Sequence, residues 1–222
     1  MEEFAQFLAV TGDTEFGDDT TLHMIENLDQ IESWRVGEAI AEAYLTDHRS
    51  SFFPWSSRWD EKTRRASLPG ADLIGLAFSD KEDCFVFGEV KTSSESRYPP
   101  SVMYGRTGFK RQLEQLRDDH SKRLRLIRYL YHRAKDESWY PRFTNAARRY
   151  MTNKSDVQIY GFLVRDVVPN SADLRARVQN LGSSCPKGMR IELFAMYLPE
   201  RSLRSIKEKI STLRTGGEDV TV

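Results

Sequence analysis

Runs of apolar residues separated by polar breaks divide the first half of the chain into regular elements. Across residues 25–47, apolar side chains recur every three to five positions, which predicts an amphipathic helix. Residues 50–65 are aromatic and polar, and we expect a first strand followed by a loop there. Residues 68–78 and 84–92 are short aliphatic and aromatic runs on either side of a polar break at 79–83, which predicts a β-hairpin.

The second half of the chain predicts further helices and two more strands. Apolar residues alternate at three and four positions over residues 107–135, so we expect one long helix that packs an apolar stripe on the sheet. Residues 156–165 and 190–198 predict strands, residues 171–178 predict a short helix, and an amphipathic helix follows Pro199. The apolar stripe of the long helix consists of Phe109, Leu113, Leu116, His120, Leu124, Ile127 and Tyr131.

The order of these elements predicts an α/β fold. A helix, three strands, a helix and a strand come first, and an extra strand and helix follow at the C-terminal end. A chain of 222 residues is long enough for one sizeable core and short for two domains. We therefore expect one domain over residues 25–212, preceded by an acidic segment at 1–24 and followed by a tail at 213–222.

Charged residues lie inside the hairpin, where the pattern otherwise predicts burial. Asp72 opens the first strand, and Glu89 and Lys91 stand near the end of the second. Because side chains two apart on a strand share a face, Glu89 and Lys91 point the same way, and Val90 points to the other side. Pairing of the strands can bring Asp72 alongside them. Such charges are costly to bury unless they pair or hold a cation, which indicates a functional site.

This layout resembles the PD-(D/E)xK nuclease superfamily, in which an acidic residue on one strand is followed by acidic-x-lysine on the next. The matching residues are Asp72 for the first position and Glu89, Val90 and Lys91 for the tripeptide. Asp72 follows residues 69–71, Pro-Gly-Ala, rather than a proline directly, which departs from the family pattern. The resemblance implies a restriction-endonuclease-like αβββαβ core, with a mixed sheet flanked by helices.

Many members of this superfamily also carry a glutamate in the helix before the hairpin. Two residues of this chain compete for that position. Glu38 projects from an apolar stripe of the predicted helix, which it shares with Trp34, Ala41 and Leu45. Glu42 lies one turn further on, and the sequence leaves the choice between them open.

The resemblance implies a catalytic site built around a divalent metal ion. Asp72, Glu89 and the backbone carbonyl of Val90 would ligate Mg²⁺ or Mn²⁺, and Glu38 would complete the shell directly or through water. Lys91 would hold or help activate the nucleophile and stabilise the negative transition state. The expected catalytic residues are therefore Glu38, Asp72, Glu89 and Lys91.

A net charge of zero hides a strong polarity along the chain. Residues 1–47 are acidic, with Arg35 as their one basic residue, whereas residues 104–150 are predominantly basic. A local basic surface is typical of proteins that bind polyanions. The polar face of the long helix would display Lys110, Arg111, Arg117, Lys122, Arg123, Arg125, Arg128 and Arg133.

We expect nucleic acid to be contacted near the start of the long helix. The candidates are Arg106, Lys110, Arg111 and Gln112. Gln112 lies where the resemblance places a glutamine close to the metal in some relatives. Residues 136–154 interleave aromatic with basic side chains, which predicts either a further nucleic-acid surface or a packed helical excursion.

Composition excludes several classes of protein. With 30% charged residues and no apolar run near 18 residues, a membrane protein is excluded. The chain starts without a cationic and apolar leader, and two cysteines are too few for a disulfide framework, so we expect a reducing, cytoplasmic setting. The two cysteines and four histidines also lack the spacing of a zinc site.

The function that we expect is hydrolysis of DNA phosphodiester bonds by a metal-dependent nuclease, the effector subunit of a defence, restriction or repair complex. Without a recognisable sequence-reading module, such a nuclease needs a partner, for example a helicase or ATPase subunit. The chain is also similar to nuclease subunits of bacterial antiphage systems such as Hachiman, in size and in a late strand that ends in Leu-Pro, here Leu198 and Pro199.

Two other functions compete with this expectation. One is a noncatalytic, nuclease-like interaction subunit, although a scaffold has no reason to keep an acidic-x-lysine pair inside a strand. The other is a small-molecule enzyme, although the chain lacks a glycine-rich phosphate loop and a cofactor fingerprint. The sequence leaves open whether DNA or RNA is cut and whether cleavage is internal or from an end.

Overall fold

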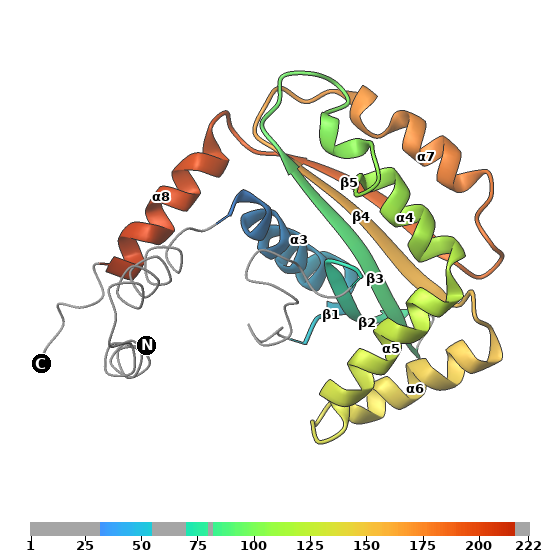
Figure 1. Ribbon diagram of the computed structural model, residues 1–222. Helices are drawn as coiled ribbons and strands as arrows, with labels where there is room; N and C mark the ends of the chain where they lie inside the picture. Colours follow the sequence, from blue (N-terminus) through green and yellow to red (C-terminus); the bar gives the residue numbers. More distant parts are fainter. Residues whose placement is uncertain (1–31, 55–69, 80–81, 216–222) are drawn as a thin grey trace, which may run out of the picture. The chain divides into compact units, whose positions relative to one another are not determined.

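The structure, a computed structural model, describes residues 32–54, 70–79 and 82–215 (Figure 1). The chain divides into two compact units, of which one is Trp34–Leu203 and the other includes the chain from Arg204 onwards. The first unit contains the sheet and every candidate site residue. The predicted acidic segment lies outside the described residues, so the predicted domain boundaries stay predictions.

Five strands form one mixed sheet in the order β1-β2-β3-β4-β5 (Figure 1). β1, β2 and β3 pair antiparallel, whereas β3, β4 and β5 pair parallel. The α/β fold, the hairpin and the two later strands are therefore confirmed. The strands are β1 (Ser51–Phe52), β2 (Leu73–Ser79), β3 (Glu82–Ser93), β4 (Val157–Arg165) and β5 (Arg190–Tyr197).

Helices flank the sheet, as expected. The short helix predicted near residue 171 is a 3₁₀ turn followed by an α-helix, and the helix predicted after Pro199 is present. Within the part of the chain described, no helix is long and apolar enough to cross a membrane. The helices are α3 (Ser33–Arg49), η2 (Ser101–Met103), α4 (Phe109–Asp118), α5 (His120–Ala134), α6 (Tyr140–Thr152), η3 (Ser171–Asp173), α7 (Arg175–Gly182) and α8 (Ser202–Thr215).

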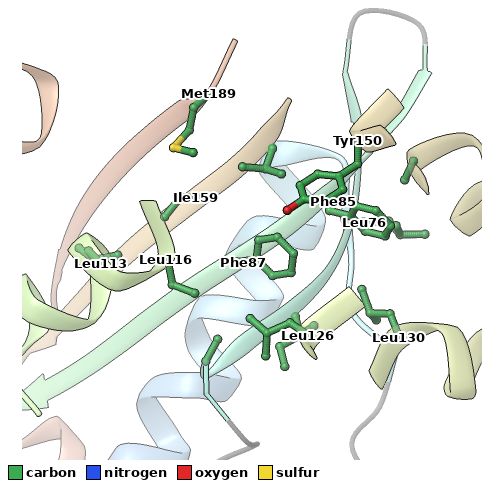
Figure 2. Close-up of a cluster of buried hydrophobic side chains, with 14 of the residues drawn as sticks. Leu76, Phe85, Phe87, Leu113, Leu116, Leu126, Leu130, Tyr150, Ile159 and Met189 are labelled. Atoms are coloured by element: carbon green, nitrogen blue, oxygen red, sulfur yellow. The ribbon is translucent and has the colours of Figure 1, made fainter. Parts of the chain in front are cut away.

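The main core lies between the sheet and the helices α4, α5 and α6. Phe85 and Phe87 of β3 contribute to it from the sheet, and Tyr150 of α6 covers Phe85 edge to face with ring centroids 5.9 Å apart (Figure 2). Since side chains alternate along a strand, Glu89 and Lys91 continue the face of Phe85 and Phe87. The candidate site therefore lies at the end of a hydrophobic face.

The opposite face of β3 is covered by α3. A Cβ atom at Gly37 would lie 2.0 Å from Thr92 Oγ1 and 3.6 Å from Val90 Cγ1, so only glycine permits this close approach. The adjacent Glu38 is thereby held near the end of the hairpin.

The prediction of one continuous helix over residues 107–135 is wrong. The chain leaves helical geometry at Asp119, whose side chain caps the start of α5 by accepting a hydrogen bond from the Lys122 N–H at 2.9 Å. The break changes which residues face the sheet. Leu124 and Tyr131, expected in the apolar stripe, are 43% and 39% exposed, and Leu126 and Leu130 are buried instead.

The same break also shows that two residues predicted on the cationic polar face of the long helix are buried. Lys122 and Arg123 were both expected at the surface, but they are only 7% and 4% exposed. Arg123 turns inward to donate to the carbonyls of Leu116 and Arg117, at 2.7 and 2.6 Å. It thereby satisfies carbonyl groups at the C-terminal end of α4 that lack helical partners.

Of the two alternatives for residues 136–154, the structure contains the packed helix, α6. Its apolar face is buried on the sheet, while two of its arginines form ion pairs with acidic residues of the same unit. Arg142 Nε lies 2.8 Å from Asp83, and Arg149 Nε lies 2.8 Å from Asp156. These arginines stabilise the attachment of α6.

Candidate active site

Asp72 comes directly before β2 and is held by two hydrogen bonds to β3. Its N–H donates to the Gly88 carbonyl at 3.0 Å, and its Oδ2 accepts from the Val90 N–H at 2.8 Å. These bonds follow from the antiparallel register, in which Leu73 pairs with Gly88. The register therefore positions the Asp72 carboxylate beside Glu89.

Glu89 and Lys91 lie on one face of β3, as the alternation predicts. Lys91 Nζ donates to Glu89 Oε1 at 2.5 Å. The Glu89 side chain is buried, and Lys91 is 20% exposed. The second oxygen of Glu89, Oε2, is buried and has no hydrogen-bond partner among the described residues.

The environment of the site raises the pKa of both Glu89 and Lys91, for different reasons. The pKa of Glu89 is raised to about 8, mainly by burial; the negative charge of Asp72 adds to the increase, and Lys91 opposes it. Burial alone would lower the pKa of Lys91, but its attraction to Glu89 outweighs burial and the pKa is raised. Lys91 is therefore an ammonium at neutral pH.

Glu38 approaches this pair from α3. Its pKa is raised to about 9, mainly by burial and then by the negative charges of Asp72, Glu42 and Glu89. For Glu42 the increase in pKa comes from burial alone. The structure thus brings Glu38, rather than Glu42, into electrostatic contact with the strand carboxylates.

The residues at this position fit a hard divalent cation. Burial and mutual repulsion disfavour the ionised carboxylates, a cation would offset both effects, and Glu89 Oε2 offers a free oxygen. Carboxylate and carbonyl oxygens are the ligands that Mg²⁺ and Mn²⁺ prefer. Within residues 32–54, 70–79 and 82–215, no three His, Cys, Asp or Glu side chains are grouped closely enough to be recognised as a metal site.

A second lysine, which the sequence did not suggest as a site residue, faces the same carboxylates. Lys122 of α5 is buried, and its Nζ donates to Gln115 Oε1 at 3.3 Å. Burial lowers the pKa of Lys122, while the charges of Glu89 and Asp72 act in the opposite direction. The signal that could have revealed it is the Asp119 cap, which changes the face of α5 that meets the sheet.

The expected nucleic-acid contacts form no side-chain hydrogen bond or ion pair with Asp72, Glu89 or Lys91 within the described residues. Gln112 donates to the Thr107 carbonyl at 3.2 Å and makes no hydrogen bond to Asp72, Glu89 or Lys91. It is Gln115, one turn later, that reaches a site residue. The other three candidates lie at the surface near the start of α4. Arg106 and Arg111 are exposed, and Lys110 Nζ lies 3.7 Å from Glu114 Oε1.

The loop that follows β3 after Ser93 is anchored by a buried arginine that sequence reasoning missed. Arg165, at the end of β4, donates to both carboxylate oxygens of Asp173 at 2.8 Å. It also donates to the carbonyls of Glu95 and Arg97, and its guanidinium lies 4.8 Å from the ring centroid of Tyr98. One side chain thus fixes the path of the chain beyond the candidate site.

Fold and site together define an α/β protein whose mixed sheet carries a buried carboxylate and lysine site at the end of a hairpin. A family model makes this more specific, since the model of the HamA family matches residues 18–211. The chain belongs to the HamA family, and hence to antiphage defence proteins that act within a multi-protein system. No curated protein matches the chain.

Membership of this family confirms the expected similarity to an antiphage protein of the Hachiman type and supports a protein partner in general. The resemblance to the PD-(D/E)xK superfamily stays a prediction.

Proposed function

We propose that this HamA-family protein is a metal-dependent nuclease of the PD-(D/E)xK superfamily that hydrolyses DNA in antiphage defence. One observation carries the proposal: Asp72, Glu89 and Lys91 lie side by side at the end of the hairpin, with Glu38 beside them. Buried carboxylates next to an ammonium are expensive to maintain for packing alone. A hydrolytic site explains why they are kept together.

In this proposal Asp72, Glu89 and the Val90 carbonyl hold Mg²⁺ or Mn²⁺, and Glu38 completes the shell directly or through water. The chemistry that the ion supplies when bound is Lewis acidity, which favours deprotonation of a nucleophilic water and offsets charge on the phosphate.

In this proposal the protein's own side chains and backbone orient the reacting groups and stabilise negative charge on the phosphate. The Val90 N–H orients Asp72 by its hydrogen bond to Oδ2, and Glu89 Oε1 fixes the position of Lys91 Nζ. The Lys91 ammonium orients the attacking water and stabilises negative charge that develops on the phosphate. Because its pKa is raised, Lys91 keeps its proton and acts as a cation rather than as a base.

DNA reaches the site along basic residues near the start of α4, for which we propose Arg106, Lys110, Arg111 and Gln112. We further propose that the protein acts in the cytoplasm with a helicase or ATPase subunit. Such a partner would choose the target, because the described fold holds no recognisable sequence-reading module.

The direct test is a nicking assay on supercoiled DNA with Mg²⁺ or Mn²⁺, with and without the partner. We expect cleavage by the wild-type protein and a loss of at least about 100-fold in Glu89→Ala and Lys91→Ala. Asp118→Ala and Lys187→Ala are matched controls, because both side chains are exposed and lie outside the site. Single-stranded RNA in parallel reactions identifies the preferred substrate.

The same assay decides against the proposal if no metal supports cleavage with or without the partner. That result would favour a noncatalytic interaction subunit that keeps the nuclease-like fold. Cleavage that persists in Glu89→Ala would instead show that the catalytic site lies in another part of the chain.

A further inference from the structure

Two adjacent buried cations on α5 differ in how their charges are satisfied. Arg123 donates to the carbonyls of Leu116 and Arg117, so its charge has a structural role at the end of α4. Lys122 has one hydrogen bond in the described part of the chain, to the neutral amide oxygen of Gln115 at 3.3 Å. Within the described residues, the charge of a lysine that is only 7% exposed and has one long hydrogen bond to a neutral amide is poorly compensated.

The position of Lys122 brings this ammonium to the candidate active site. A Cβ atom at Gly70 would lie 3.5 Å from Lys122 Cε, so the side chain runs along the segment that leads into Asp72. Asp72 and Glu89 act on it electrostatically, yet the described residues show no ion pair between Lys122 and either of them. The lysine therefore faces the carboxylates without being neutralised by either.

The ammonium of the other lysine of the site, Lys91, is already hydrogen-bonded to Glu89. Lys91 Nζ is 2.5 Å from Glu89 Oε1, which uses one of its donors and fixes its direction. A phosphodiester that approaches Asp72 and Glu89 brings more negative charge to a site that already holds these two carboxyl groups and on which Glu38 acts electrostatically. A second cation with free donors meets this requirement, because charge-assisted hydrogen bonds to phosphate are among the strongest in proteins.

We propose that Lys122 is a second active-site cation, which binds a phosphate oxygen of the DNA substrate on the α5 side of Asp72 and Glu89. Gln115 acts as a positioning residue, since its amide oxygen directs one ammonium donor and leaves the others for the phosphate. This role rests on the proposed nuclease function for its catalytic meaning. DNA binding through Lys122 can be measured whether or not cleavage occurs.

The test measures binding of a fluorescein-labelled DNA duplex in EDTA over a range of salt concentrations. We expect Lys122→Met to weaken binding about tenfold and to reduce the slope of log K against log salt by about one. Lys122→Arg should retain most of the affinity. Lys187→Met, which removes an exposed lysine elsewhere, should change the affinity less than twofold and serves as the control.

A second variant keeps the proposal open to refutation if Lys122→Met fails to fold. Gln115→Glu has nearly the same shape and places a carboxylate beside Lys122, so the lysine stays packed but its charge is occupied. We expect the same loss of DNA affinity in this variant.

Mn²⁺ binding by calorimetry distinguishes the loss of a phosphate contact from damage to the carboxylates. We expect Lys122→Met to bind Mn²⁺ at least as tightly as the wild-type protein, because a like charge has been removed. Wild-type DNA affinity and salt slope in both Lys122→Met and Gln115→Glu would overturn the proposal. Absence of cleavage by the wild-type protein would count against the nuclease function and leave the DNA-binding result for Lys122 intact.

Discussion

At the scale of single residues, the carboxyl group of Glu89 is fully buried, but only one of its two oxygens has a hydrogen-bond partner in the described chain. One oxygen is paired with Lys91, and the other has no hydrogen-bond partner within the residues described. Ionising such a group is unfavourable unless a cation is bound. The pKa of Glu89 should therefore depend on whether a cation is bound at the site.

We predict that the metal-free protein becomes less stable as pH rises. The folded pKa of Glu89 is about 8, against an ordinary value of 4.5, so unfolding releases a proton between these values. The stabilisation is fully present below the unfolded pKa and is lost as pH rises through the folded pKa. Thermal midpoints in EDTA from pH 5 to pH 9 should fall more steeply for the wild-type protein than for Glu89→Gln.

Glu38 should contribute in the same direction, since its folded pKa is about 9. Glu38→Gln is therefore a second variant expected to flatten the pH dependence. Parallel curves for the wild-type protein and both variants would mean that neither carboxyl group is buried as described.

At the scale of secondary-structure elements, the site depends on a helix break and on a close helix contact. The break at Asp119 separates α4 from α5 and turns the side chain of Lys122 inward. The contact at Gly37 allows α3 to approach β3 and holds Glu38 near the hairpin. Both features are local, and both can be tested by single substitutions.

Replacement of the helix cap should destabilise the protein. Asp119→Ala removes the acceptor for the Lys122 N–H, which typically costs about 1 kcal/mol. Asp118→Ala is the neighbouring control, because Asp118 forms only a surface ion pair with Arg117, of a kind worth about 0–1 kcal/mol. Urea unfolding of the two variants should show the larger loss for Asp119→Ala, and an equal loss would argue against the capping role.

Addition of a methyl group at Gly37 should also destabilise the protein, by about 1–3 kcal/mol, because the new Cβ would collide with Thr92 Oγ1. The Thr92 hydroxyl has no hydrogen-bond partner in the described chain, so Thr92→Ala makes space without breaking a hydrogen bond. Unfolding measurements on both single variants and on the double variant test the contact. Additive effects, with no recovery in the double variant, would contradict it.

At the scale of the whole molecule, the candidate ligands come from three elements that are close only when the chain is folded. Glu38 lies on α3, Asp72 precedes β2, and Glu89 is on β3. An ion held by all three binds the folded state and not the unfolded chain, so it must stabilise the fold by mass action.

We predict that Mn²⁺ raises the thermal midpoint at pH 8. At a free concentration of about 100 times Kd the stabilisation would be about 2.7 kcal/mol. Asp72→Asn and Glu89→Gln should lose this increase, whereas Asp118→Asn, which changes an exposed carboxylate, should keep it. An increase of equal size in all four proteins would place the ion outside the proposed site.

Much of the fold could be predicted from short segments of the sequence. The hairpin, the strands near residues 160 and 194, and the shared face of Glu89 and Lys91 each depend on residues close together in the chain. The path of the chain through Asp119 could not be predicted from periodicity, because the residues on either side also fit one uninterrupted helix. The error placed Lys122 at the surface.

The sequence by itself determined that acidic and basic groups stand on one side of the second hairpin strand, since covalent geometry makes side chains alternate with a period of two. Only the tertiary structure decided that Glu38, rather than Glu42, is close enough to interact electrostatically with these groups, and that Lys122 is buried near them. Those choices depend on how closely α3 and α5 pack against the sheet. Such packing is set by contacts between residues far apart in the chain, for which local pattern carries no information.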